Sequence, residues 1–171
     1  MGMPLKVIRK QQNSKMCLVC GLSNRYGLKA RFYELENGDL VALVRPAEEH
    51  QGYPNRLHGG IAGAILDETI GRAILPYLGD DQWWVTIELH LKYRNPIPLD
   101  QELRVFGRVT APGDRFFQGS GEIVTRDGTV GATGTGRFMK MPLEKIDGFD
   151  PVEDEWQVSP SPEDPEWVEP A

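Results

Sequence analysis

The sequence predicts an α+β fold in which one strongly curved antiparallel sheet wraps around one long buried helix. The helix is predicted for residues 60–78 (GIAGAILDETIGRAILPYL), which are apolar nearly all round and so indicate a buried helix rather than a surface one. Strand patterns lie on both sides of it. No further helix separates those that follow, so they must pair largely antiparallel. A helix that is apolar on most sides needs cover on most sides, which a curved sheet provides.

The strands are predicted from alternating apolar and β-branched residues bounded by turn residues. Two of them, 28–35 and 40–45, flank Asn37-Gly38, a strong hairpin signal, and Pro46 ends the second because it lacks a backbone N–H. After the helix, strands are predicted at 83–93, 102–110, 115–126 and 129–140, with hairpin turns at 111–114 and 127–128. In the first of these, one face would carry Val85, Ile87, Leu89, Leu91 and Tyr93.

Composition divides the chain into a basic leader (residues 1–16), a folded domain (17–141) and an acidic, Pro-rich tail (142–171). The tail carries a charge of −9, from ten Asp or Glu and one Lys, so the net charge of −6 leaves +3 on the remainder. We expect the tail to be disordered or loosely wrapped, with Trp156 and Trp167 as the residues that could dock it. A body this weakly basic suits an anionic small ligand and argues against a nucleic-acid partner.

The sequence also argues against a membrane partner. Its apolar runs fall short of the roughly 20 residues of a membrane span, and its first residues lack the apolar core of a secretory signal. The expected location is cytoplasmic.

Cys17 and Cys20 form a single C-x-x-C pair ahead of the first long strand. One pair leaves a tetrahedral zinc site two ligands short, and the spacing of His50, His58 and His90 matches no metal pattern, so no metal is expected. A thioredoxin-type role would need the pair at the start of a helix that follows a strand. A structural or redox-silent pair, an occasional disulfide and a metal ligand pair stay open as alternatives.

The start of the helix has features of a catalytic site. A helix N-terminus offers unpaired N–H groups, and Gly59 and Gly60 let a ligand atom approach the backbone, so a polarised carbonyl oxygen can bind there. Further along, small residues flank Asp67 on one stripe of the helix. An ionised carboxylate is costly to bury among apolar residues, so Asp67 is either a hydrogen-bonded structural group or a catalytic one. Glu68 precedes Arg72 by four residues, the favourable order for a helical ion pair.

At these residues the sequence resembles the hotdog thioesterase superfamily. His58-Gly59-Gly60, followed after six residues by Asp67, is similar to the family pattern HGG-x6-D. Residues 86–97 are similar to the strand after the family's helix, and residues 127–136 resemble its closing hairpin. Residues 17–28 are similar to its opening C-x-x-C-G-x-x-N-x-x-G-L. The resemblance spans about residues 17–140, and the branch that it resembles most is that of the phenylacetate-pathway (PaaI-like) thioesterases.

The resemblance implies the hotdog fold and the hydrolysis of an acyl-CoA thioester to free acid and CoA, with coenzyme A as part of the substrate and no other cofactor. It implies that Asp67 is the general base or nucleophile and that the Gly59 N–H polarises the carbonyl. His58 would hold the loop or contact the ligand, and Thr86 would position the water. It also implies a homodimer or homotetramer in which each active site is built from both chains.

Further residues are candidates for binding the substrate. Gly52 stands where several relatives carry an Asn or Gln, and Gln51 or Asn55 could take over that role. Lys92, Arg94 and Arg137 are candidates for the nucleotide phosphates. The predicted substrate-binding residues are together Gly60, Asn55, Glu68, Lys92, Arg94 and Arg137. Candidates for an acyl pocket are Trp83, Trp84, Tyr77, Phe116 and Phe117.

Other functions compete with hydrolysis. The main alternative is a non-catalytic acyl-CoA-binding hotdog protein, a sensor or scaffold, although binding alone has no need of a carboxylate such as Asp67 beside the carbonyl. A hotdog hydratase or dehydratase uses a His and an acid together, but there the acid precedes the His, and here His58 precedes Asp67. An interaction module that uses the acidic tail could coexist with any of these.

Overall fold

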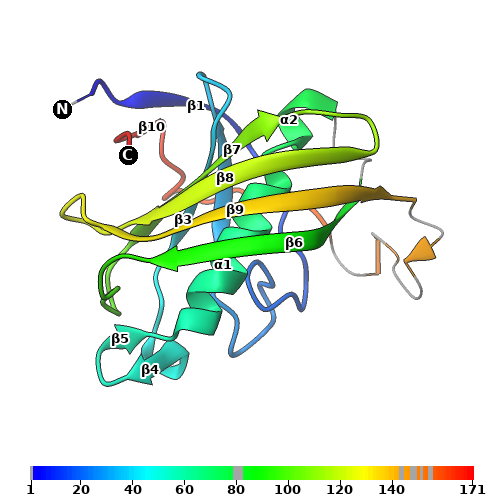
Figure 1. Cartoon of the computed structure of the whole chain (residues 1–171). Coiled ribbons are helices and arrows are strands. Elements are labelled where there is room, and N and C mark those ends of the chain that lie inside the picture. Colours follow the sequence, from blue (N-terminus) through cyan, green and yellow to red (C-terminus); the bar gives the residue numbers. More distant parts are fainter. Residues whose placement is uncertain (1, 79–82, 143–144, 147–149, 151, 154–155) are drawn as a thin grey trace.

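The main sheet of the protein has eight strands in the order β10-β1-β2-β3-β7-β8-β9-β6, and every neighbouring pair is antiparallel (Figure 1). The computed structural model describes residues 2–78, 83–142, 145–146, 150, 152–153 and 156–171. The strands are β1 (Leu5–Lys10), β2 (Arg31–Leu35), β3 (Leu40–Val44), β6 (Trp83–Tyr93), β7 (Leu103–Ala111), β8 (Phe116–Val124), β9 (Val130–Met141) and β10 (Trp167–Val168). The predicted α+β class, with a curved antiparallel sheet around one helix, is confirmed.

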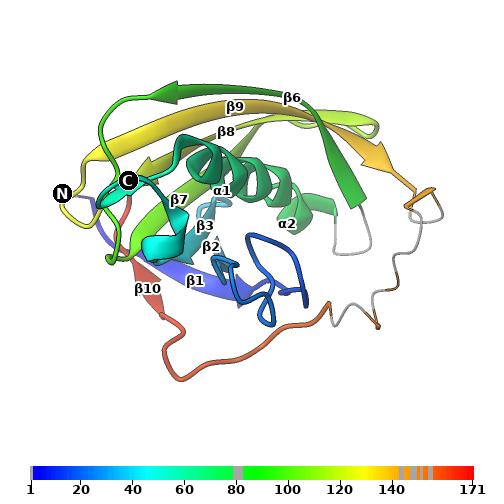
Figure 2. The same ribbon diagram turned by 90° about the horizontal axis from the view of Figure 1, so that it is seen from below.

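Helix α1 (Gly59–Arg72) lies inside the curve of the sheet, as Figure 2 shows. A one-turn 3-10 helix, η1 (Glu48–His50), and a small hairpin of β4 (Gln51–Tyr53) and β5 (Arg56–Leu57) lead into it. In the part of the chain that the structure describes, no helix is long and apolar enough to cross a membrane.

The helix approaches the sheet closely because a row of glycines lies beneath it. Gly107 of β7 pairs with Gly121 of β8, which in turn pairs with Gly134 of β9. A Cβ at Gly121 would lie 2.8 Å from the Cγ1 of Ile70, and one at Gly107 would lie 2.6 Å from the carbonyl oxygen of Thr69. These distances are shorter than side-chain contacts allow, so the helix can sit at this depth only above glycines.

The predicted helix at 60–78 is wrong at its C-terminal end. Helix α1 ends at Arg72, and a separate turn, α2 (Leu75–Leu78), follows. Pro76 is the reason, because its ring would clash with the carbonyl of Arg72, four residues back, and it has no N–H to donate. The Arg72 carbonyl instead accepts a bond from the side-chain amide of Gln11 (3.4 Å).

Strand β6 also differs from prediction, because a β-bulge interrupts its alternation. Thr86 pairs with Phe138 of β9 and Glu88 with Arg137, which leaves Ile87 as the extra residue. Ile87 is 45% exposed rather than on the buried face. The bulge moves the inward face from odd to even positions ahead of it, and so it directs Thr86 toward helix α1. The predicted face that joined Val85 and Ile87 to Leu89 is therefore wrong.

The two ends of the chain add strands outside the predicted domain of residues 17–141. Strand β1 lies within residues 1–16, and β10 of the tail pairs with it through Leu5 and Val168. The tail is further tied down where Asp164 accepts bonds from Lys10 Nζ and the Tyr33 hydroxyl, both at 2.7 Å. Residues 156–171 are therefore not disordered, and Trp156 docks the tail on the body, as the sequence allowed, by packing against Trp83.

We predict that Gly121→Ala lowers the free energy of unfolding by about 1–3 kcal/mol, because the added methyl group would press on the Phe106 carbonyl oxygen and on Ile70. Urea unfolding of the single and double variants measures the coupling between positions 70 and 121. In an Ile70→Ala background the cost should shrink in part, because the contact with the Ile70 side chain is gone while the contact with the Phe106 carbonyl remains. If Gly121→Ala lowers the free energy of unfolding by the same amount in that background, the loss arises from strain in the strand backbone and not from contact with the helix.

Candidate active site

The centre of the site is Asp67, on the face of helix α1 that looks toward β6. Its Oδ1 accepts a hydrogen bond of 2.6 Å from the hydroxyl of Thr86, the residue that the bulge turns inward. Asp67 is half-buried, whereas Thr86 is exposed at the edge of the sheet. The sequence predicted both residues for the site, and the structure brings them together.

Burial raises the pKa of the Asp67 carboxyl group above its ordinary value. The hydrogen bond from Thr86 acts in the opposite direction, since it stabilises the carboxylate, and the neighbouring charge of Glu68 raises the pKa again. A carboxylate with a raised pKa is a better proton acceptor than a fully solvated one. The site therefore holds one carboxylate whose affinity for a proton is higher than that of a solvated carboxylate.

His58 caps the N-terminus of α1. Its Nδ1 accepts a hydrogen bond from the backbone N–H of Gly60 (2.9 Å), and its carbonyl accepts one from the N–H of Ala62 (3.0 Å). In the neutral ring the proton therefore lies on Nε2. His58 thus accepts hydrogen bonds from two backbone N–H groups at this helix end, those of Gly60 and Ala62. The N–H of Gly59 points out of the helix start and has no hydrogen-bond acceptor among the described residues.

Tyr93 fixes the other side of Gly59, a contact that the sequence did not indicate. Its hydroxyl donates to the Gly59 carbonyl (2.8 Å), and a Cβ at Gly59 would lie 3.4 Å from the tyrosine ring. Tyr93 had been assigned only to the apolar face of its strand. The end of β6 thus holds the start of α1, just as Thr86 holds the carboxylate further along.

The hairpin before the helix places Gly52 directly against His58. A Cβ at Gly52 would lie 3.2 Å from both the Cα and the Cδ2 of His58, so a longer side chain would have to displace the histidine. Asn55 lies at the tip of this hairpin with a positive φ of 60°, and Gln51 is exposed on β4. Within this chain neither of them hydrogen-bonds to His58, Gly59 or Asp67.

A cavity of about 280 Å³ opens beside Asp67. Aromatic side chains from three parts of the chain form much of its wall: Trp83 and Trp84 of β6, Phe138 of β9, and Trp156 of the tail. Trp156 packs against Trp83 with ring centroids 5.2 Å apart. The predicted pocket residues Trp83 and Trp84 therefore line the cavity. Phe117 lies behind Trp84, whereas Tyr77 and Phe116 are not part of its wall.

Glu68 forms the predicted ion pair with Arg72 and is not free to bind a ligand. Its Oε1 accepts from Nη2 (2.8 Å) and Nε (3.0 Å) of Arg72, and its Oε2 accepts from the thiol of Cys17 (3.0 Å). Arg72 is buried between the rings of Phe32 and Trp156. Of the two neighbouring acids on helix α1, Glu68 is therefore paired with a cation, Arg72, whereas Asp67 accepts its hydrogen bond from the neutral hydroxyl of Thr86.

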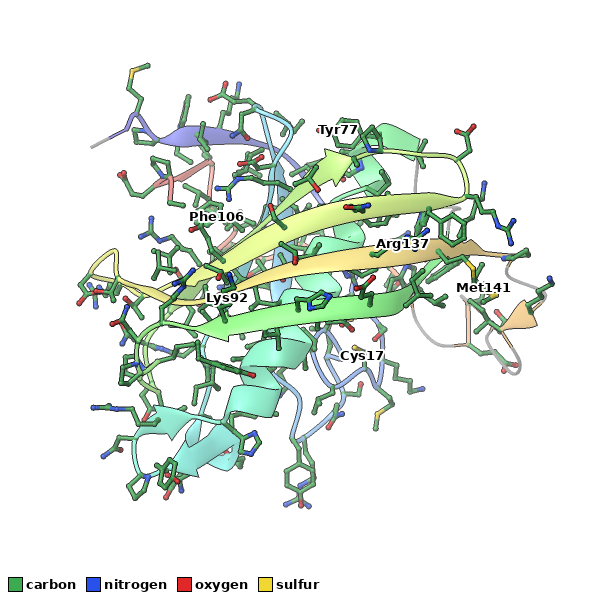
Figure 3. The ribbon with its side chains drawn as sticks, viewed as in Figure 1. Cys17, Tyr77, Lys92, Phe106, Arg137 and Met141 are labelled. Atoms are coloured by element: carbon green, nitrogen blue, oxygen red, sulfur yellow. The ribbon has the colours of Figure 1, made fainter. Side chains whose placement is uncertain are left out.

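Two of the three predicted phosphate ligands, Lys92 and Arg137, lie apart from Asp67 on the outer face of the sheet (Figure 3). Lys92 and Arg94 share a shallow hollow with Arg108. Arg137 pairs with Glu88, four residues from Lys92 along β6, a separation of about 13 Å, and it stacks on Phe116 instead. The structure therefore does not bring Lys92, Arg94 and Arg137 together.

One further distance decides how the site can work. Gly59 and Asp67 are eight residues apart on α1, which corresponds to about 12 Å along the helix axis. An oxyanion donor lies about 3 Å from the carbonyl oxygen, and a base that acts through one water lies about 6 Å from the carbonyl carbon. About 12 Å of helix exceeds this combined reach, so the Gly59 N–H and the Asp67 carboxylate of the same chain do not act on one carbonyl.

Comparison with known proteins shows what this fold and site are similar to. The thioesterase superfamily model matches residues 55–132, which include the HGG segment, Asp67 and Thr86. Among solved structures, the thioesterase superfamily protein RHA08564 is 27% identical with a TM-score of 0.65, over 72% of this chain and 59% of that one. This chain has the hotdog fold, as its sequence predicted, and over residues 55–132 it is similar to the thioesterase superfamily.

Two relatives have names that mention coenzyme A. Acyl-coenzyme A thioesterase THEM5 of Mus musculus is 29% identical over 115 residues, which are 67% of this chain but only 45% of that protein. The BH2602 protein of Bacillus halodurans, whose structure was determined with CoA, is 28% identical with a TM-score of 0.54, over 59% of this chain and 66% of that one. The E. coli PaaI protein shares the fold at 16% identity, so the PaaI-like branch stays a prediction.

We predict that Asp67→Asn stabilises the protein at neutral pH. Because the folded-state pKa of Asp67 is raised, the folded protein binds more protons than the unfolded chain between the two pKa values, and stability falls as pH rises through that window. The variant has no such loss. Urea unfolding at several pH values should show an advantage that is largest above the folded pKa and shrinks toward the unfolded pKa of about 3.9. An advantage that does not depend on pH would contradict the raised pKa.

Proposed function

We propose that the protein is an acyl-CoA thioesterase that hydrolyses a thioester to a free acid and CoA. The observation that carries this proposal is the half-buried carboxylate of Asp67, held by Thr86 beside a cavity with aromatic walls. The match of residues 55–132 to the thioesterase superfamily model and the THEM5 relative support the same reaction class. A protein that only binds acyl-CoA would have no use for a base at this position.

The chemistry needs few groups, because a thioester carbonyl is already electrophilic. Asp67 accepts a proton from a water molecule that Thr86 helps to orient, and the resulting hydroxide attacks the carbonyl carbon. Alternatively, the carboxylate attacks directly and water then cleaves the anhydride. On either route the C–S bond breaks and CoA leaves as a thiol, with no metal or organic cofactor required. The oxyanion that forms needs an N–H donor, the role of Gly59.

The separation of Gly59 from Asp67 leads us to place each active site between two copies of the chain. Strand β6 is the edge of the sheet, is eleven residues long and, among the residues that the structure describes, pairs only with β9. Such an edge is suited to pair with another strand. Antiparallel pairing with the β6 strand of a second copy would join the two sheets into one.

The contacts along β6 show how this pairing would complete the site. Thr86, near one end, contacts Asp67, and Tyr93, at the other end, contacts Gly59. If the two-fold axis passes between Leu89 and His90, Thr86 of one copy lies opposite Tyr93 of the other. The Gly59 N–H of one copy then lies next to the Asp67 carboxylate of its partner. A dimer built this way contains two such sites, and pairing of dimers into a tetramer is compatible with it.

The cavity indicates an acyl group of limited size. It is bounded by indole and phenyl rings, and Trp156 brings the tail into its wall. Flat apolar surfaces favour an aryl or short-to-medium acyl chain, which would stack against them. The tail would thus be part of the substrate pocket rather than an independent appendage.

We predict that Asp67→Asn lowers the rate of hydrolysis by at least ~10²-fold, because a general base is lost while the hydrogen bond from Thr86 can persist. Thiol release from short, medium, long, phenylacetyl and hydroxybenzoyl CoA esters measures this and ranks the acyl groups. The matched control is Glu68→Gln, the neighbouring acid, which should keep most of the activity. If no thioester is hydrolysed by the natural protein while CoA esters raise its melting temperature, it is a binding protein instead.

We predict that two inactive variants restore activity when they share a dimer. Gly59→Pro removes only the N–H, and proline fits there because His58 already has an extended conformation (φ −64°, ψ 135°) and position 59 begins the helix. The loss should be about 10²–10³-fold in kcat. Gly59→Ala retains the N–H and is the control.

In mixed dimers of Gly59→Pro with Asp67→Asn, purified by two tags, one site receives both defects and the other receives neither. Activity should return to about half of that of the natural dimer. Mixed dimers that stay inactive would show that both groups serve a site within one chain.

A further inference from the structure

The cysteine pair that the proposed reaction does not use forms an organised cluster. We propose that Cys17 and Cys20 are a redox-active thiol pair that a hydroperoxide converts into a reversible intramolecular disulfide. Their sulfur atoms and a carboxylate oxygen of Glu68 all lie within 4.8 Å of one another. A tight turn holds the pair, closed by a bond from the Gly21 N–H to the Cys17 carbonyl (2.9 Å). A Cβ at Gly21 would collide with that carbonyl, so only glycine allows the turn.

The two thiols are in unequal environments. Cys17 is partly exposed and lines the cavity beside Asp67, so a small reagent can reach it (Figure 3). Cys20 is fully buried. One accessible thiol next to one protected thiol is the arrangement of an attacking and a resolving cysteine.

The surroundings of Cys17 favour its thiolate. The backbone N–H groups of Val19 (3.3 Å) and Cys20 (3.5 Å) donate to its sulfur. The Cys20 thiol is the main cause of the lowered pKa of Cys17 and outweighs the partial burial of Cys17, whereas the same contact and burial raise the pKa of Cys20. Glu68 opposes ionisation of Cys17, but its charge is compensated by Arg72 at 2.8 Å, and its oxygen is placed to accept the thiol proton.

Arg72 also argues for a disulfide over a metal site. Its Nη2 lies 3.2 Å from the Cys20 sulfur and 2.8 Å from Glu68 Oε1. The positive charge of Arg72 therefore already lies beside two of the three possible metal ligands, Cys20 and Glu68. A metal ion there would be repelled by the buried guanidinium group. The pair is therefore better suited to react with an oxidant than to bind a metal.

The reaction proceeds in two balanced steps. The Cys17 thiolate attacks one peroxide oxygen, the O–O bond breaks, and the sulfur becomes a sulfenic acid while the other oxygen leaves and takes up the thiol proton. The Cys20 thiol then attacks the sulfenic sulfur, the S–S bond forms, and water leaves. The two thiols lose two electrons and the hydroperoxide gains them. The disulfide removes the hydrogen bond from Cys17 to Glu68 in the cavity wall.

Titration of the full-length reduced protein with hydrogen peroxide tests the pair without recourse to thioesterase activity. Both thiols should disappear together, the intact mass should fall by two hydrogen atoms without covalent dimers, and dithiothreitol should restore both. In Cys20→Ser, dimedone should trap a sulfenic acid on Cys17. In Cys17→Ser, Cys20 should react at least ~10-fold more slowly than Cys17 does in the first variant. Circular dichroism checks that both variants are folded.

Other results would overturn the proposal. Thiols that persist at peroxide concentrations that oxidise free dithiothreitol would show an inert structural pair. Equal reactivity of the two single variants would remove the attacking and resolving roles. A stoichiometric metal ion in the protein as purified, lost in both variants, would show that the cluster is a metal site after all.

Discussion

The close contact between helix α1 and the sheet is the constraint on which the rest of the structure depends. Thr69 and Ile70 rest on a row of paired glycines that crosses three strands, and any larger side chain there would lift the helix. At this depth the sheet can curve around the helix until its last strand, β6, runs alongside it. Asp67 and Gly59 then meet their partners Thr86 and Tyr93 on that strand. The site can form because helix α1 lies close enough to the sheet for side chains of the edge strand β6 to contact it.

Two adjacent acids on α1 show how position on a helix assigns chemical roles. Asp67 and Glu68 differ by one residue, about 100° around the axis. Glu68 points toward Arg72 and Cys17, where its charge is compensated and both oxygens are occupied. Asp67 points toward the edge strand, where one hydroxyl group is its partner and burial raises its pKa. The first is suited to organise a buried cluster, and the second to accept a proton.

The same edge makes a single chain incomplete as a catalyst under the proposed function. The helix start and the carboxylate are separated by the length of the helix between them, and only a second copy can supply the missing group. The cavity wall, by contrast, is completed within the chain, because the tail brings Trp156 back to Trp83. Catalytic geometry would thus depend on association, and the shape of the acyl pocket on the chain's own tail.

The sequence by itself determined the features that depend on local backbone preferences. Asn37-Gly38 and Asp127-Gly128 form turns with glycine at a φ of 87°, and Glu68 pairs with Arg72 one turn on. Only the tertiary structure decided the bulge that aims Thr86 at Asp67, the docking of the tail on β1 and the cysteine pair beside Glu68. These features join residues far apart in the chain, and their free energy arises only when the sheet has closed around the helix, so no local pattern encodes them.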